Sequence, residues 1–144
     1  MQPLEIRRIR VRQGKLDVES ATRIDCLHVD GALANAVLQR YPNLRNHACV
    51  NKSGNASFGA ELVGTELAHL LEHLSIELQA QHLKGLGRKP PLLAGHTSWL
   101  DELQATAPHG YALMRTTVSF VDDVIALRAV KEAASTLNEF VSLR

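Results

Sequence analysis

The pattern of apolar and polar residues predicts strands near both ends of the chain. Residues 4–12 alternate with a period of two, and the alternation slips by one residue at Arg7 and Arg8. This slip is typical of a strand with a β-bulge. Residues 22–29 and residues 110–120 alternate in the same way and predict two more strands.

Apolar residues at helical spacing predict three helices. The first covers residues 32–41 and ends before Pro42, which cannot continue a helix. The second covers residues 65–84, with Thr65 as its N-cap. The third covers residues 124–143 at the end of the chain. The repeated leucines of the second segment make it the strongest helix signal in the sequence.

The segments between these elements carry weaker signals. Residues 46–60 are rich in Asn, Ser and Gly, which predicts a loop, and loops on a rigid scaffold often carry functional residues. A short strand is predicted over residues 58–63 and a short helix over residues 98–105. Because strands and helices do not alternate regularly, we expect an α+β fold, with a small mixed sheet packed against the long central helix and the C-terminal helix.

Length and composition narrow the class of protein. The 144 residues are 45% hydrophobic and 22% charged, which predicts a single domain over residues 1–144 with its own core. A net charge of +1 argues against broad nucleic-acid binding. No apolar run has the length of a membrane span, and the charged N-terminus is unlike an export signal. We therefore expect a cytoplasmic protein that binds neither nucleic acid nor membrane.

One group of residues in the long helix suggests chemistry. His69 and His73 are one helical turn apart, so both rings can reach a single ion, and Glu72 lies beside them. This is the H-x-x-E-H pattern, in which two histidines bind zinc and the glutamate acts as general base on a zinc-bound water. The alternative is a polar stripe of an amphipathic helix that faces solvent.

The third zinc ligand is left open by the sequence. Glu77 is four residues after His73 and shares its face, but it is about 12 Å along the helix axis from His69. A ligand from the preceding loop is an easier solution, and Cys49 and His47 are the candidates there. Cys49 is equally well explained as a buried thiol, and Glu77 as a partner of Lys84 or as a solvated side chain.

The helix and its surroundings resemble the N-terminal domain of cyanophycin synthetases. That domain carries a GT…H-I-V-E-H-V-A-L-E-L-Q…G-F-G-R-T-R pattern. The matching segments here are Gly64-Thr65, residues 69–79 and 85–88, the loop from Tyr41 to Cys49, and the start of a strand at residues 109–111. Residues 113–117 depart from the family, which has a carboxylate in this strand.

The resemblance implies an α+β domain that contacts the aspartate–arginine polymer. Some members of the family have a zinc-peptidase-like activity. The resemblance implies that such an activity would use His69 and His73 as ligands and Glu72 as base here. The family's ATP-grasp and ligase-like domains have no counterpart in these 144 residues, so ligation is not expected of this chain.

Three functions are therefore expected as alternatives. The first is a zinc-dependent hydrolase that acts on a peptide or a cyanophycin-like polymer. The second is a non-catalytic module that binds the polymer or an enzyme of cyanophycin metabolism. The third is a homo-oligomer in which the histidines lie at an interface.

Overall fold

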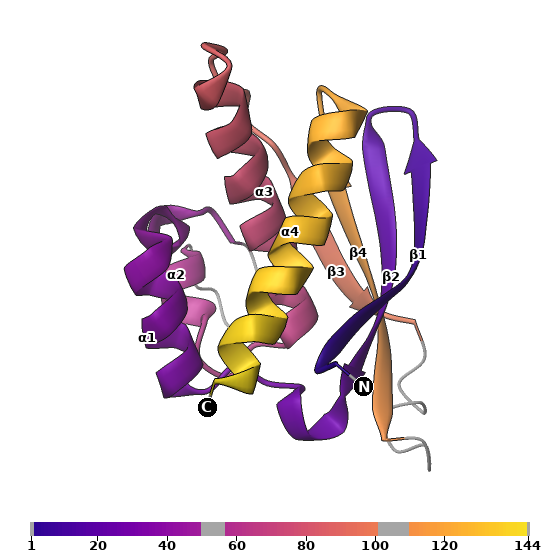
Figure 1. Ribbon diagram of the computed structural model, residues 1–144, viewed down its shortest axis with the longest axis vertical. Coiled ribbons are helices and arrows are strands. Elements are labelled where there is room, and N and C mark those ends of the chain that lie inside the picture. Colours follow the sequence, from indigo (N-terminus) through magenta and orange to yellow (C-terminus); the bar gives the residue numbers. More distant parts are fainter. Residues whose placement is uncertain (1, 50–56, 101–109, 144) are drawn as a thin grey trace.

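A four-stranded sheet forms one layer of the molecule, with the strand order β1-β2-β4-β3 (Figure 1). The computed structural model describes residues 2–49, 57–100 and 110–143. The strands are β1 (Leu4–Arg12), β2 (Lys15–Arg23), β3 (Gly95–Trp99) and β4 (Tyr111–Ser119). All pairings among these strands are antiparallel, so the prediction of a mixed sheet is corrected in this respect.

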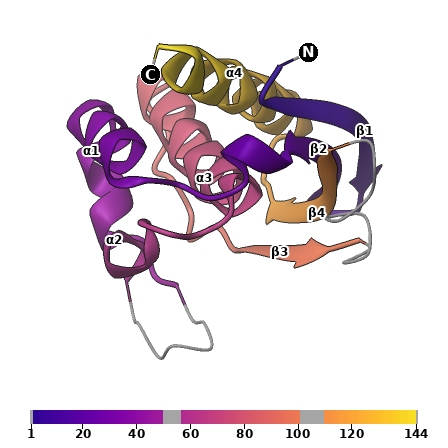
Figure 2. The same cartoon turned by 90° about the horizontal axis from the view of Figure 1, so that it is seen from below.

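Helices cover one face of this sheet. They are α1 (Gly31–Arg40), α2 (Phe58–Glu61), α3 (Leu67–Gly85) and α4 (Asp123–Ser142), with short 3₁₀ turns at Ile24–Cys26 and Pro42–Asn46. The long helices α3 and α4 lie against the sheet, and α1 and α2 lie on the far side of α3 (Figure 2). The expected α+β fold, with a central and a C-terminal helix on a small sheet, is confirmed.

The sheet is buried on one face only. Along β4, Ala112, Met114, Thr116 and Val118 are buried and face the helices, while Arg115 is exposed. This alternation is what an antiparallel sheet with one solvated face requires. The main core lies between this face and the leucines of α3.

The first predicted strand is confirmed and the second is not. β1 has its register shift between Ile6 and Arg8, at the predicted slip. The second strand is β2, which follows a tight turn at Gly14 with φ of 72° and ends at Arg23, where a 3₁₀ turn begins. β2 was missed because Ser20 and Thr22 face the core, so its buried positions are not uniformly apolar.

Two further segments differ from their predictions. Residues 58–61 form the helix α2 instead of a strand, because the Ser57 side chain accepts a hydrogen bond from the Ala60 N–H and caps a helical turn. The helix predicted over residues 98–105 is also wrong at its start, since Trp99 belongs to β3. Residues 101–105 of that prediction lie outside the described residues.

The three long helices lie where the sequence places them. Asp30 caps α1 and Asp122 caps α4, each by accepting a hydrogen bond from a backbone N–H three residues later. α3 begins at Leu67, and its N-cap residue is Glu66, not Thr65. The Thr65 hydroxyl is used elsewhere, as the next subsection describes.

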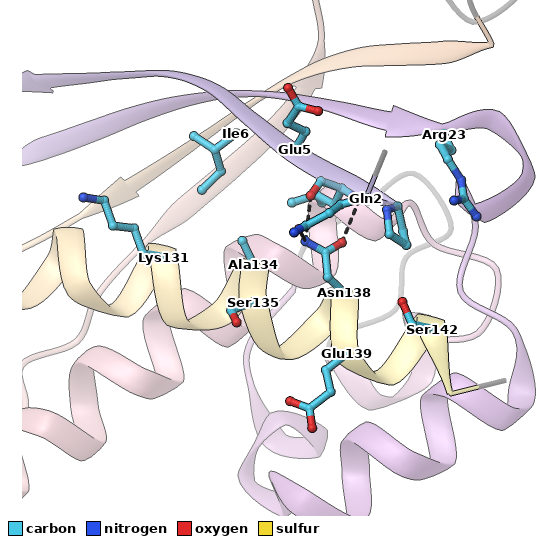
Figure 3. Close-up of a pocket in the computed structure, with 12 residues that line it drawn as sticks. Gln2, Glu5, Ile6, Arg23, Lys131, Ala134, Ser135, Asn138, Glu139 and Ser142 are labelled. Carbon is cyan, nitrogen blue, oxygen red and sulfur yellow. Dashed lines mark hydrogen bonds between the residues drawn. The ribbon is translucent and has the colours of Figure 1, made fainter.

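A groove of about 890 Å³ separates the edge strand β1 from α4 (Figure 3). The Asn138 side chain crosses it: its Oδ1 accepts from the Leu4 N–H at 2.8 Å and its Nδ2 donates to the Leu4 carbonyl at 2.8 Å. The amide therefore acts as a strand partner for the edge of β1 and fastens α4 to the sheet.

Candidate metal centre

Helix α3 brings the two predicted histidines together. The ring centroids of His69 and His73 are 4.9 Å apart, as expected for residues one turn apart on one helix face. His73 is buried and His69 is half-buried, so the two rings do not form a solvent-facing stripe.

Cys49 completes a three-residue group with these histidines. One ligand atom from each of Cys49, His69 and His73 lies within 4.8 Å of the others. The Cys49 Sγ is 3.7 Å from the His69 Nε2. Zn–S and Zn–N bonds of about 2.3 and 2.1 Å at a tetrahedral angle separate the two donor atoms by about 3.6 Å. The group can hold a metal ion, with no disulfide at Cys49 to prevent it.

Two neighbouring residues orient the imidazole rings. The Thr65 Oγ1 is 2.8 Å from the His69 Nδ1, which leaves the His69 Nε2 facing Cys49. The Phe58 ring stacks on His73 at a centroid distance of 3.8 Å and meets His69 edge-on at 5.1 Å. Histidine ligands in metal sites are commonly held in this way by a hydrogen bond at the second ring nitrogen.

A second chain of contacts leads from His73 to Glu77. The His47 Nδ1 is 3.2 Å from the His73 Nδ1, and the His47 Nε2 is 3.8 Å from the Glu77 Oε1. The structure thus places Glu77 behind His47 and outside the group formed by Cys49 and the two histidines. The His73 Nδ1 therefore faces His47, and the other ring nitrogen, Nε2, lies 3.5 Å from the Glu72 Oε2.

Glu72 lies next to the group and is held from the sheet. Its Oε2 is 3.5 Å from the His73 Nε2, and its Oε1 accepts a hydrogen bond from the Thr97 hydroxyl at 2.8 Å. Gly95 leaves room for the carboxylate, because a Cβ at that position would lie 2.7 Å from the Glu72 Cγ. Burial raises the pKa of Glu72 to about 7, against the opposing effect of the Thr97 hydrogen bond.

The electrostatics of the histidines favour their neutral forms. Burial lowers the pKa of His73 to about 3, and the neighbouring His69 and His47 add to this effect. Burial also lowers the pKa of His69, although the carboxylates of Glu66 and Glu61 act in the opposite direction. Neutral imidazole is the form that binds a metal ion.

The sequence identified most residues of this centre but not all. The candidates His47, Cys49, His69, Glu72, His73 and Glu77 all lie in one neighbourhood. Sequence reasoning missed Phe58, Thr65 as a partner of His69, Gly95 and Thr97. Gly95 and Thr97 belong to no recognisable sequence motif, because only the packing of β3 against α3 brings them close to Glu72.

No protein-family model, curated protein or solved structure matches this chain. Among the described residues, none of the helices combines the length and the hydropathy of a membrane span.

Proposed function

We propose that the protein is a zinc-dependent hydrolase of peptide-like bonds. The observation that carries the proposal is the convergence of Cys49, His69 and His73 within 4.8 Å, with the Glu72 carboxylate 3.5 Å from the His73 Nε2. Three protein ligands, which leave one position open, are typical of catalytic zinc sites, whereas structural sites have four.

The donor set favours zinc over other metal ions. One thiolate and two imidazoles form a soft, nitrogen- and sulfur-containing set, whereas magnesium and calcium prefer oxygen ligands. With zinc held by Cys49, His69 and His73, the ion would lower the pKa of a bound water to about 7 and would polarise a substrate carbonyl. These are the contributions that hydrolysis of an amide needs at neutral pH.

The remaining residues of the centre have roles that follow from their positions. The Glu72 carboxylate is the general base, because it is the acceptor beside the ligand atoms, and it returns the proton to the leaving amine. Thr97 and Gly95 keep it in place, and the Thr65 hydroxyl engages the His69 Nδ1 and so leaves the Nε2 for the metal. His47 and Glu77 support His73 from behind.

Metal analysis tests the first part of this proposal. Protein purified without chelator is expected to contain about one zinc ion per chain, and His73→Ala is expected to lose it. His82→Ala is the matched control, because His82 contacts Glu132 at 2.9 Å on the surface, away from the centre. Absence of zinc from the unaltered protein, or its retention in His73→Ala, would contradict the proposal.

Hydrolysis assays test the second part. The substrates to examine are an aspartate–arginine polymer and short peptides, and release of new amino groups is the readout. Glu72→Gln is expected to retain zinc and lose hydrolysis by two or more orders of magnitude. If Glu72→Gln binds zinc and polymer normally and the unaltered protein shows no hydrolysis, the chain is instead a binding module.

A further inference from the structure

The edge strand β3 presents unused backbone groups on one side. At its two ends, the Ala94 carbonyl accepts from the Ser119 N–H at 2.8 Å, and the Leu100 N–H donates to the Leu113 carbonyl at 3.0 Å. Residues of an antiparallel strand alternate in the direction of their backbone groups. The N–H and C=O groups of Gly95, Thr97 and Trp99 therefore point away from β4.

No described residue uses these outward groups. β3 is an outer strand of the sheet, with β4 on one side and no described strand on the other (Figure 1). Within the described ranges, the backbone of Gly95, Thr97 and Trp99 has no hydrogen bond on the side away from β4. Gly95 is exposed, and Thr97 and Trp99 are half-buried. An outer strand in this state can accept a further strand.

This free edge is a wall of the pocket that contains the candidate metal centre. The pocket has a volume of about 460 Å³. Its lining includes Gly95, Thr97 and Trp99 of β3 together with the ligands Cys49, His69 and His73. Two of the three β3 residues with unused backbone groups, Gly95 and Thr97, also lie against Glu72. A chain paired with β3 would run past the ligands and the general base.

We propose that the substrate is an extended peptide that pairs with β3 as a fifth strand. Paired strands lie about 4.8 Å apart, so the added chain enters the pocket beside the metal ligands. Backbone hydrogen bonds to Gly95, Thr97 and Trp99 would supply affinity independent of sequence, as in other cases of strand addition. The reaction assigned to this peptide rests on the proposed hydrolase, whereas the pairing itself does not require a metal.

The charge of the pocket favours a basic peptide. Its lining includes the carboxylates of Glu61, Glu66 and Glu72, and no lysine or arginine lines it within the described residues. Glu61 and Glu66 line the same pocket as the ligand His69, so their negative field acts on whatever enters it. Arginine side chains on the peptide would gain from this field, and glutamate side chains would be repelled.

Residue-resolved amide hydrogen exchange tests the pairing. The experiment uses the unaltered protein stripped of metal by chelator, so that the probe is not cleaved and the Glu72 carboxylate is kept, with millimolar acetyl-(Ala-Arg)₃-amide. We expect exchange at the N–H groups of Gly95, Thr97 and Trp99 to slow at least fivefold. His96 and Ser98 already donate toward β4 and are expected to change little. Equal effects at odd and even positions, or no effect, would overturn the proposal.

Matched peptides serve as controls. Two analogues of the arginine peptide carry N-methyl groups, one on the backbone nitrogens of its alanines and the other on those of its arginines. In a paired strand only one of these two sets of N–H groups faces β3, so only one analogue loses the donors that the pairing needs. One methylated analogue is therefore expected to lose the effect and the other to keep it. Acetyl-(Ala-Glu)₃-amide is expected to bind at least tenfold more weakly than the arginine peptide. Loss of binding by both methylated analogues, or equal binding of the arginine and glutamate peptides, would contradict strand pairing with a basic peptide.

The tests separate this inference from the proposed function. If the protein purified without chelator holds no zinc and β3 still shows alternating protection, the hydrolase is overturned and the peptide site remains. Zinc binding and peptide hydrolysis without alternating protection would overturn the pairing and leave the hydrolase standing.

Discussion

At the scale of residues, the candidate centre depends on which atoms surround each imidazole. Thr65 and Phe58 orient the rings of His69 and His73, and His47 connects His73 to Glu77. These contacts distinguish Cys49 from Glu77 as the third ligand. Cys49 lies within the group of ligand atoms, and Glu77 lies behind it.

Cobalt substitution of two variants decides between these ligands. With Cys49 as the ligand, the cobalt-loaded protein is expected to show a thiolate-to-cobalt absorption band that Cys49→Ser lacks. Glu77→Gln is expected to keep the band and to weaken metal binding by no more than about 10-fold, the lower end of the effect of removing an outer-shell partner, because Glu77 reaches His73 only through His47. A Cys49→Ser variant with an unchanged spectrum would show that Cys49 is not the third ligand.

The close approach of Gly95 to Glu72 gives a second residue-scale prediction. In Gly95→Ala, the new methyl group would displace the Glu72 carboxylate from Thr97. We expect hydrolysis to fall about 100-fold and stability to fall by about 1–3 kcal/mol, with zinc content unchanged.

Gly31→Ala is the control for this substitution, because a Cβ at Gly31 has no neighbouring atom within 4 Å. It is expected to change neither quantity appreciably. Full activity in Gly95→Ala would show that the position of Glu72 observed here is not the one used in hydrolysis.

At the scale of elements, two contacts between segments far apart in the chain hold the structure together: β3 packs on α3 at the candidate centre, and α4 packs on β1. The packing of β3 on α3 supplies Gly95 and Thr97 to Glu72, and α4 is fastened to β1 through Asn138 (Figure 3). The second contact joins residues far apart in the chain, since Leu4 and Asn138 are separated by 134 positions.

Asn138→Ala tests the contact between α4 and β1. The substitution leaves the Leu4 N–H and carbonyl without their partner at a buried position, which is expected to cost about 1–3 kcal/mol of unfolding free energy. Chemical denaturation measures it. Ser135→Ala, one turn earlier in the same groove, is expected to change stability by less than about 0.5 kcal/mol. Equal effects of the two substitutions would contradict this role of Asn138.

At the scale of the whole molecule, burial of the centre couples folding to pH. The folded protein binds the Glu72 proton more tightly than the unfolded chain, because burial raises the pKa from 4.5 to about 7. The unfolded chain, in contrast, binds a proton at His73 more tightly than the folded protein does, since burial lowers the pKa of that residue to about 3. The two effects oppose each other between about pH 4.5 and 6.5.

Comparison with Glu72→Gln isolates the glutamate in metal-free protein. As the pH rises from 4.5 to 7, the unaltered protein is expected to lose stability relative to the variant, by about 3 kcal/mol in total, because it must ionise a buried carboxyl. Above about pH 6.5 His73 is largely neutral in both the folded and the unfolded state, so this part of the curve reports on the Glu72 carboxyl; at lower pH the two residues, which are in contact, titrate together. Denaturation in chelator at several pH values measures this difference, and a pH-independent difference would contradict the burial of an ionising Glu72.

The sequence by itself determined the long helices, the bulged first strand and the spacing that places His69, Glu72 and His73 together. These features follow from local periodicity, capping and a Pro stop, which act within a few residues of the chain. β2 and α2 escaped prediction because polar residues on β2 face the core and a serine cap changed a strand-like segment into a helical turn.

Only the tertiary structure decided which residues complete the centre. Cys49 reaches the histidines from a preceding loop, and Gly95 and Thr97 reach Glu72 from an outer strand. These contacts depend on how the loop and the sheet pack against α3. The pattern of apolar residues within a single segment does not predict that packing.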